Sequence, residues 1–435
     1  MRRHFLWIST ACLLLAAAVQ AGEGLPVLTL DEALSQALER NRDIQKAQAY
    51  REWVRGKYLE ERSAALPRLS LSASKRRDFD DSLSALTGGL FPSTEDTTSY
   101  GATVDQAVFT WGQVGAAIRA AKVGLASADE QLRLYRQAVQ RDVTQAFYDV
   151  LLAKELLAVA QEEVDQRTAH LGEARKRFEL GTATDYDVLA AEVALQNARP
   201  ALIAAENTLR RSRLALGLLL GLEEGVDAAG ALQAAPIPLP SFSEALETAR
   251  RLRPEVRAQE QVVAVRRELL AIARAGDKPR LDFSAGWGRK TLGVSGLHLS
   301  GRTWNAGLTL SFPLFDGLRT RGRVLEASSD LLQAQLEERK LRESLAVEVQ
   351  GALDAVWEAE AVLRALEGAE AQAQRLLDMA EKGFAFGVKT QLEVDDALVQ
   401  RNAARAHAAR ARRDLAVAQT NLRWVLGTLG EDRTP

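Results

Sequence analysis

Residues 384–404, FAFGVKTQLEVDDALVQRNAA, decide the fold, because a similar stretch lies 206 positions earlier. That earlier stretch, residues 178–198, is FELGTATDYDVLAAEVALQNA. Each copy places a glycine between two long helical patterns, with a threonine three positions later. A glycine there can end a helix in a left-handed conformation, and the threonine can cap the next helix. Each stretch therefore predicts the tip of a helical hairpin.

Shorter echoes extend the similarity over the rest of the chain. The tripeptide EAL at residues 32–34 recurs at 244–246, and PRL at 67–69 recurs at 279–281, each 212 positions further on. Repetition at a long fixed distance indicates repeated structural units. The sequence thus predicts two internal structural repeats, residues 22–220 and 243–435. Residues 221–242, which contain the turn-forming run AAPIPLP, are predicted to link them.

The N-terminus has the pattern of a secretory signal peptide. Arg2 and Arg3 precede an apolar run over residues 5–19, and VQA at 19–21 is a small-residue cleavage site. We expect residues 1–21 to be removed by cleavage after Ala21. The only cysteine, Cys12, lies inside this segment and lacks the leucine three places before it that a bacterial lipoprotein would have. Loss of the two arginines moves the formal net charge from −2 to −4, which argues against nucleic acid as a partner.

Long helices dominate the predicted secondary structure. Thr29 and Asp31 begin a helix that runs to about residue 65 and that Pro67 ends. Two much longer helices are predicted over residues 112–180 and 318–383, each spanning roughly 100 Å at about 1.5 Å per residue. Shorter helices return from the two tips over residues 182–220 and 388–427. Helices of that length exceed any globular core, so we expect a coiled-coil-like tube or rod.

Two strand pairs interrupt the helices, over residues 69–109 and 281–315. Apolar residues alternate there with serine, threonine, glycine and asparagine, as in LSLSAS from residue 69 and TWNAGLTLSF from residue 303. Such alternation is typical of a membrane β-barrel, with one face on lipid and the other on water. A soluble, half-buried sheet alternates equally well. The secretion signal and the tryptophans favour the barrel.

The number of strands bears on assembly. One chain offers four, which cannot close a barrel alone, and an open edge in lipid is forbidden. Two chains would give eight strands and a barrel filled by its own side chains. Three chains would give 12 strands and leave a passage, so a homotrimer is the smallest assembly with a channel.

Signals for enzymatic chemistry are missing from the sequence. The four histidines are scattered, and no zinc, nucleophile-elbow or phosphate-loop motif occurs. The carboxylate pairs Glu162-Glu163 and Asp395-Asp396 lie on long charged helices. The arginine-rich run over residues 405–413 is interpreted as a solvated helix side matched to acidic neighbours. We therefore expect no enzyme, no cofactor and no metal site.

Taken together, the chain resembles the TolC-like outer membrane efflux proteins over essentially its whole mature length. The resemblance rests on the LTLDEAL opening, on PRL before each first strand, on PLFDG at residues 313–317 with FTWG at 109–112 as its looser counterpart, and on the two tip sequences. Individually these motifs are modest. Together, in order and duplicated, they are specific.

The resemblance implies a mainly α-helical fold with a membrane β-barrel portion. Three copies would share a 12-stranded barrel in the outer membrane, embedded in its lipid, and long antiparallel helical hairpins would continue it as an α-barrel tunnel in the periplasm of a Gram-negative cell. The tunnel would dock with a periplasmic adaptor protein and an inner-membrane pump of the RND or ABC type, and export small molecules or proteins. The residues implied in adaptor contact lie at the tips: Gly181, Thr182, Gly387 and Val388.

The resemblance also implies a gate at the periplasmic entrance. Glu393 and Asp396 fall where family members have a constricting acidic ring, and they are three residues apart on one helix face. Lys389 falls where family members have a basic residue that links neighbouring hairpins, and Asp187 falls where they have the acidic partner of that residue. Phe384 takes the place of an aromatic residue, often tyrosine, that makes a further link. The alternative interpretation is that these residues are ordinary solvated charges on a helix and have no role in a gate.

A second class of function stays open at this point. A periplasmic coiled-coil adaptor or scaffold protein would share the export signal and the long hairpins. The feature that discriminates is the duplication with two strand pairs, because an adaptor has a single hairpin flanked by small β domains. The sequence does not identify the exported substrate.

Overall fold

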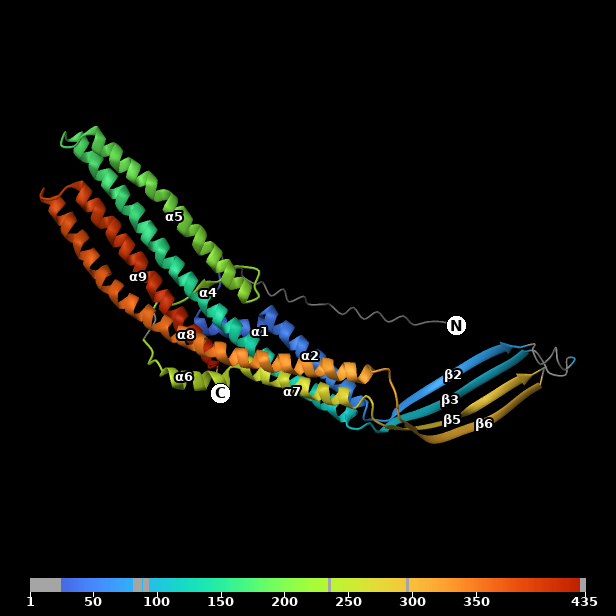
Figure 1. Cartoon of the computed structure of the whole chain (residues 1–435). Coiled ribbons are helices and arrows are strands. Elements are labelled where there is room, and N and C mark those ends of the chain that lie inside the picture. The colour runs from blue at the N-terminus through green and yellow to red at the C-terminus, as the bar shows by residue number, and fades with distance from the viewer. Residues whose placement is uncertain (1–24, 81–87, 89–93, 234–235, 295–296, 431–435) are drawn as a thin grey trace, which may run out of the picture.

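The computed structural model describes residues 25–80, 88, 94–233, 236–294 and 297–430. The molecule is elongated, with a four-stranded sheet at one end and two helical hairpin tips at the other (Figure 1). The expected signal peptide and its cleavage site after Ala21 lie outside the described residues. None of the described helices is both long and apolar enough to cross a membrane.

The long helices α4 (Gln113–Glu179) and α8 (Arg319–Ala385) have 67 residues each. They lie where the sequence predicts helices over 112–180 and 318–383, and at about 1.5 Å per residue each spans roughly 100 Å. Helix α5 (Asp185–Leu219) returns along α4, and α9 (Gln391–Leu426) returns along α8. These two antiparallel hairpins make up the half of the molecule that is far from the sheet.

The first helix is not continuous, contrary to the expectation of one helix to about residue 65. It is divided into α1 (Leu30–Arg40) and α2 (Arg42–Ser63) at Asn41, whose ψ is 131°. The Asn41 side chain accepts hydrogen bonds from the amides of Asp43 and Ile44, and its Nδ2 donates to the Leu219 carbonyl at 2.8 Å. The asparagine thus ends one helix and caps the next, as short polar side chains do.

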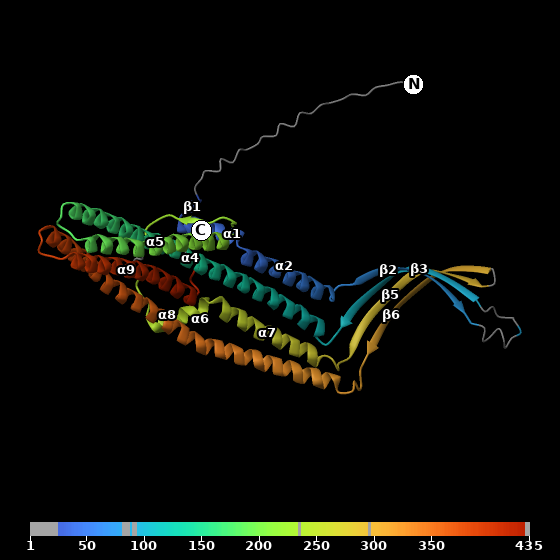
Figure 2. The ribbon, with the colours of Figure 1, turned by 90° about the horizontal axis from the view of Figure 1, so that it is seen from above.

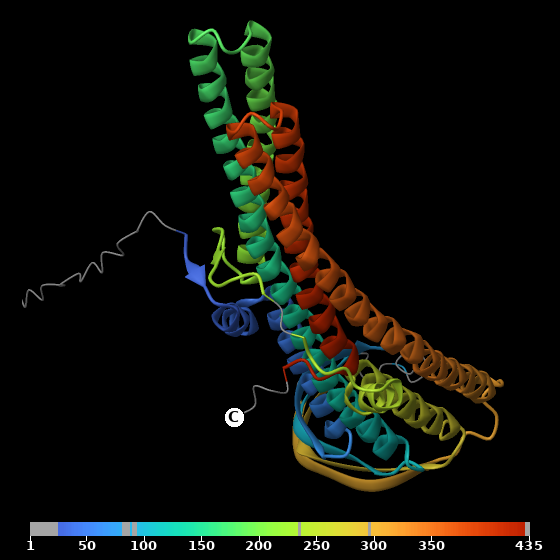
Figure 3. The same ribbon diagram turned by 90° about the vertical axis from the view of Figure 1, so that its left-hand side faces the viewer.

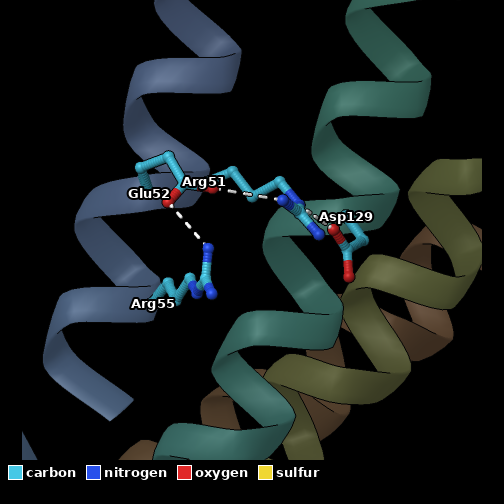
Figure 4. A network of polar contacts seen from close by, with 4 residues as sticks. All are labelled: Arg51, Glu52, Arg55 and Asp129. Carbon is cyan, nitrogen blue, oxygen red and sulfur yellow. Dashed lines mark hydrogen bonds and ion pairs between the residues drawn. The ribbon is translucent and has the colours of Figure 1, made fainter. Parts of the chain in front are cut away.

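In the half nearer the sheet, four helices form one layer in the order α2, α4, α7 (Pro254–Arg274), α8 (Figure 2). An ion pair joins each neighbouring pair of helices: Arg51–Asp129, Arg119–Glu268 and Arg266–Asp330. Figure 4 shows the first of these, with Arg51 reaching from α2 to Asp129 of α4. Exposed pairs contribute little stability, about 0–1 kcal/mol each, so they set the order of helices more than they hold the layer.

The sheet consists of β2 (Arg68–Phe79), β3 (Thr94–Phe109), β5 (Arg280–Val294) and β6 (Leu297–Ser311), in that order and all antiparallel. One face carries Leu69, Leu71, Trp287, Trp304 and Leu308, all more than half exposed. The opposite face carries serine, threonine, glycine and asparagine. Strands β2 and β6 are the two unpaired edges.

The segment predicted as a linker is packed against the helices. Its short strand β4 (Asp227–Ala228) pairs in parallel with β1 (Val27–Leu28), and Val226 is fully buried. Asp227 accepts bonds from Lys154 at 2.7 Å and Arg213 at 2.9 Å, so it ties the segment to α4 and α5. Helix α6 (Phe242–Leu252) follows and packs on α8 and α9. These contacts form a collar about half-way along the helices.

Candidate functional site

Two turns of matching geometry form the ends of the hairpins (Figure 3). Gly181 and Gly387 both have φ of +72°, a left-handed conformation that side chains other than glycine adopt with strain. In each turn the amide that follows the glycine reaches back to the helix, Thr182 to the Arg177 carbonyl and Val388 to the Gly383 carbonyl, at 2.8 Å. The glycine predicted from sequence thus closes each helix with a six-residue hydrogen-bonded turn.

Each returning helix begins with a reciprocal cap. Thr390 caps α9, and Glu393 accepts hydrogen bonds from the Thr390 amide at 2.8 Å and hydroxyl at 3.1 Å. Lys389 Nζ donates to the other Glu393 oxygen. The Lys389 bond, together with the Thr390 amide, lowers the pKa of Glu393 from 4.5 to about 2. Glu393 is therefore ionised at any physiological pH and structurally engaged.

The low pKa of Glu393 predicts the pH range in which the second tip loses its cap. A carboxylate with a depressed pKa contributes stability above its unfolded value, 4.5, and loses that contribution as the pH falls towards about 2. Deuterium exchange of residues 388–394, corrected for intrinsic rates, should therefore rise below pH 4.5 and not above it. Glu393→Gln keeps an oxygen acceptor for Thr390 and should flatten this profile. A rise centred near pH 6 would contradict the assignment.

The expected Lys389–Asp187 link is not made within one chain. Asp187 accepts from the Thr184 amide at 2.8 Å and hydroxyl at 2.7 Å, because Thr184 caps α5 and Asp187 is its partner in the reciprocal cap. These two bonds, the amide bond first, lower the pKa of Asp187. Lys389, in the second tip turn, is paired with Glu393 in the first turn of α9. A bond between Lys389 and Asp187 of different copies of the chain stays a prediction.

Phe384 lies between the two hairpins of one chain. Its ring is under the guanidinium of Arg177, whose Cζ is 4.4 Å from the ring centroid. Arg177 belongs to α4 and Phe384 to α8, so this cation–π contact joins the hairpins close to their tips. Such contacts contribute about 0.5–1 kcal/mol at exposed sites. Phenylalanine thus makes an aromatic link without the hydroxyl that a tyrosine would use.

Further from the tips, polar pairs between α4 and α9 also join the two hairpins. The pairs are Arg167–Asp395 at 2.6 Å, Glu162 with both Arg401 and Arg405, and Asp149–Arg413 at 2.7 Å. We call these pairs, together with Arg177–Phe384, the hairpin seam. Near the tips α4 supplies the cations, whereas further away α9 supplies them. Because the charges change sides, a shifted register would place like charges together, and the seam fixes how the two hairpins align.

Asp395 is the central residue of the seam. Besides Arg167, it is 3.7 Å from His170 Nδ1, and Gln391 donates both to it and toward that histidine. Burial raises the pKa of Asp395, but the His170 hydrogen bond and the Arg167 charge lower it further than burial raises it. The Arg167 side chain is only 10% exposed, so this charge is largely withdrawn from water.

Sequence reasoning did not single out Arg167 and His170, and it noted Asp395 only as a neighbour of Asp396. Asp396 is exposed, whereas Asp395 points to α4, because residues one apart on a helix face different directions. The sequence did contain a signal for the helix face of α9 that contacts α4. Four residues recur there at four-residue spacing, Arg401, Arg405, Ala409 and Arg413, and Ala409 is buried against α4. The arginine-rich run is matched to acidic neighbours, as interpreted from the sequence, but Arg405 and Arg413 are half-buried against α4 rather than on a solvated side.

A groove of 590 Å³ lies between the tips, lined by His170, Tyr186, Phe384, Gln391 and Asp395 among others. The tip turns themselves expose large apolar side chains. Leu180, Phe386 and Val388 are 78%, 84% and 79% exposed, and each belongs to a tip turn. Of these only Val388 was expected from sequence. Exposed apolar residues gathered at the end of a polar rod mark an interaction surface.

Comparison with known proteins identifies the architecture. The family model described as "Outer membrane efflux protein" matches residues 33–222 and 245–428. The chain is 26% identical to the outer membrane protein TolC of Vibrio cholerae over 98% of this chain and 95% of that protein. It is 32% identical to protein CyaE of Bordetella pertussis over 55% of this chain, but spans only 52% of CyaE.

The fold agrees with that result. The crystal structure of the CmeC outer membrane channel of Campylobacter jejuni superposes with a TM-score of 0.82 at 18% identity, covering 93% of this chain and 87% of that one. Homologues and structural neighbours are outer-membrane channels of Gram-negative bacteria that extend into the periplasm, and they are not enzymes. This chain therefore belongs to the outer membrane efflux protein family and is located in the outer membrane.

Proposed function

We propose that three copies of this chain form a closed channel-tunnel that exports small molecules or proteins by passive conduction through a gated periplasmic entrance. Its two sequence repeats would each supply two strands to a 12-stranded barrel and one long hairpin to the tunnel. The observation that carries the proposal concerns the edges of the sheet and of the helical layers. Each has one edge strand or edge helix on either side, and these edges lie on the same two sides of the molecule.

One side consists of β2, α2 and α5, and the other of β6 and α8. Both sides expose large apolar residues over long stretches. On the first side these are Tyr50, Trp53, Leu59, Val193, Ile203 and Leu214, and on the second Leu325, Leu332, Leu336, Val347 and Trp357, all more than 45% exposed. Because the two sides differ, the contact between copies is head-to-tail, and such a contact closes into a ring when its rotation permits.

The strand directions support the same closure. Strand β2 runs away from the helices and β6 runs towards them, so β6 of one copy meets β2 of the next as an antiparallel neighbour. Two copies give an eight-stranded barrel, whose interior side chains fill. Three copies are the fewest that leave a passage.

At the entrance, Glu393 and Asp396 from each copy would form an acidic constriction. Lys389 and Asp187 would link hairpins of neighbouring copies, and Phe384 with the seam would hold the two hairpins of one copy together. Gly181, Thr182, Gly387 and Val388 shape the tips that a periplasmic adaptor would contact, with Leu180 and Phe386 as additional apolar anchors. The inner-membrane pump, of the RND or ABC type, would deliver the substrate. The alternative of a periplasmic adaptor is set aside because the family match covers both halves of the chain.

Assembly and conduction can be tested on the purified full-length protein. Native mass spectrometry of the detergent-solubilised protein should give three times the mass of the mature chain, and the same sample should insert into planar bilayers with discrete conductance steps. A stable, monodisperse monomer with full β content would contradict the ring. A trimer that never conducts in any condition, even with its tips destabilised, would contradict the channel.

A further inference from the structure

The apolar face of the sheet, which the barrel proposed above would turn towards lipid, carries an organised group of cations. Residues directly opposite each other on antiparallel strands point to the same face. One row across the sheet is Leu71, Ala102, Trp287 and Trp304. The next row away from the helices is Ala73, Tyr100, Arg289 and Arg302. Two arginines therefore lie side by side, immediately beyond two tryptophans, on the face that carries the apolar residues.

The tryptophans give the depth of these arginines in the membrane. Apolar side chains such as Leu308 and Leu310 occupy this face between the helices and the tryptophan row. Trp287 and Trp304 are 65% and 79% exposed, and such aromatic residues border the apolar band of a barrel at the level of the headgroups. Arg289 and Arg302 lie two residues further on, about 7 Å along the strand. The helices extend into the periplasm, so this border belongs to the outer leaflet.

Among the residues that the structure describes, no carboxylate is paired with either arginine. Arg289 and Arg302 are direct cross-strand partners, and like charges in that position repel. Arg289 Nε donates to Ser300 Oγ at 2.8 Å, which leaves the two terminal nitrogens of its guanidinium group without a hydrogen bond among the described residues. Lys75, on the same face in the following row, also lacks an ion pair among the described residues. By contrast, Arg77 nearby is held by Asp96 with bonds of 2.6 and 2.7 Å.

We propose that Arg289 and Arg302, supported by Lys75, bind the phosphate group of a phosphorylated lipid of the outer leaflet. Two adjacent guanidinium groups match the charge and the planar hydrogen-bonding geometry of phosphate oxygens. Trp287 and Trp304 then lie against the part of the lipid where sugar and acyl chains meet. Lys75, two strands away at about 10 Å, adds positive charge to the same surface. The anion removes the repulsion between the arginines and fixes the barrel at one depth in the membrane.

This proposed lipid site depends on the barrel proposed above, but it concerns the contact of the barrel with the membrane and not conduction. The test uses the whole assembled protein in nanodiscs and a diphosphorylated glucosamine-based lipid as the probe, with its dephosphorylated form as a comparison. Bound lipid is counted by native mass spectrometry after release into detergent. The variant is Arg289→Gln with Arg302→Gln. The matched control is Arg76→Gln with Lys290→Gln, which removes the same charge at neighbouring levels of the opposite, polar face.

We expect the wild type and the control to retain the phosphorylated lipid and the arginine variant to bind it about tenfold or more weakly. Removal of the phosphates from the lipid should weaken binding to the wild type by a similar factor. Millimolar inorganic phosphate should not displace the lipid, because it lacks the acyl chains that the tryptophans contact. Equal binding of the two lipids by the wild type, displacement by free phosphate, or equal loss in the control would each overturn the proposal. Conductance measured on the same samples separates these outcomes from failure of the channel itself.

Discussion

Arg167→Glu is expected to open the periplasmic end of the tunnel. The Arg167 guanidinium is 10% exposed and bonded to Asp395 at 2.6 Å, so the variant would place two carboxylates face to face in the seam. Loss of a partly buried charged partner costs on the order of 2 kcal/mol or more in each copy. Moving a two-state equilibrium from 1:99 to 99:1 takes about 5.5 kcal/mol, which three such changes together reach.

Single-channel conductance in planar bilayers measures this effect. We expect a conductance several times that of the wild type, with the trimer intact by native mass. The charge-swapped variant Arg167→Glu with Asp395→Arg is the matched control and should return conductance towards the wild-type value, because the pair is restored with reversed sign. If Arg167→Glu leaves conductance unchanged while the trimer is intact, the seam does not hold the entrance closed.

Local turn chemistry made much of this fold predictable. Gly181 and Gly387 were expected to end helices, and both have the left-handed φ that this requires. Thr184 and Thr390 were expected to cap, and each forms a reciprocal cap with the residue three positions on. Strand alternation identified the four strands of the sheet. All of these signals depend on a few consecutive residues, so they can be recognised without knowing what lies next to them.

The features that sequence reasoning missed depend on tertiary neighbours. Asn41 divides a helical pattern because its Nδ2 finds the Leu219 carbonyl, which is 178 residues away in sequence. The segment around Asp227 is fixed by Lys154 and Arg213 rather than by any strand signal of its own. In the sequence, Asp395 is one of many charges on a charged helix. Its role depends on Arg167, which α4 places beside it. Of the predicted gate residues, Glu393 is fixed by the cap and Asp396 is exposed, but their meeting across a three-fold axis is a property of the assembly.

Removal of both acids from the predicted constriction, by Glu393→Gln with Asp396→Asn, is expected to abolish block by cations. Two carboxylates from each of three copies would converge on a narrow entrance, and like charges so close attract a multivalent cation strongly. Glutamine at 393 keeps an oxygen acceptor for Thr390, so the cap that Glu393 now forms is retained. Asparagine at 396 preserves the size of an exposed side chain. The variant therefore changes charge while leaving the tip geometry in place.

The measurement is block of single-channel current by a hexammine-type trivalent cation added from the periplasmic side. The wild type should be blocked at low concentration, and the double variant should need roughly 100-fold more cation and lose its preference for cations over anions. Glu367→Gln with Asp378→Asn is the matched control, because both acids are exposed on α8 and neither belongs to the tip. Its block should match the wild type. Unchanged block and selectivity in the tip variant would show that Glu393 and Asp396 are ordinary surface charges. A comparable loss in the control would show that the general negative charge of the tunnel, rather than a ring at its entrance, binds the cation.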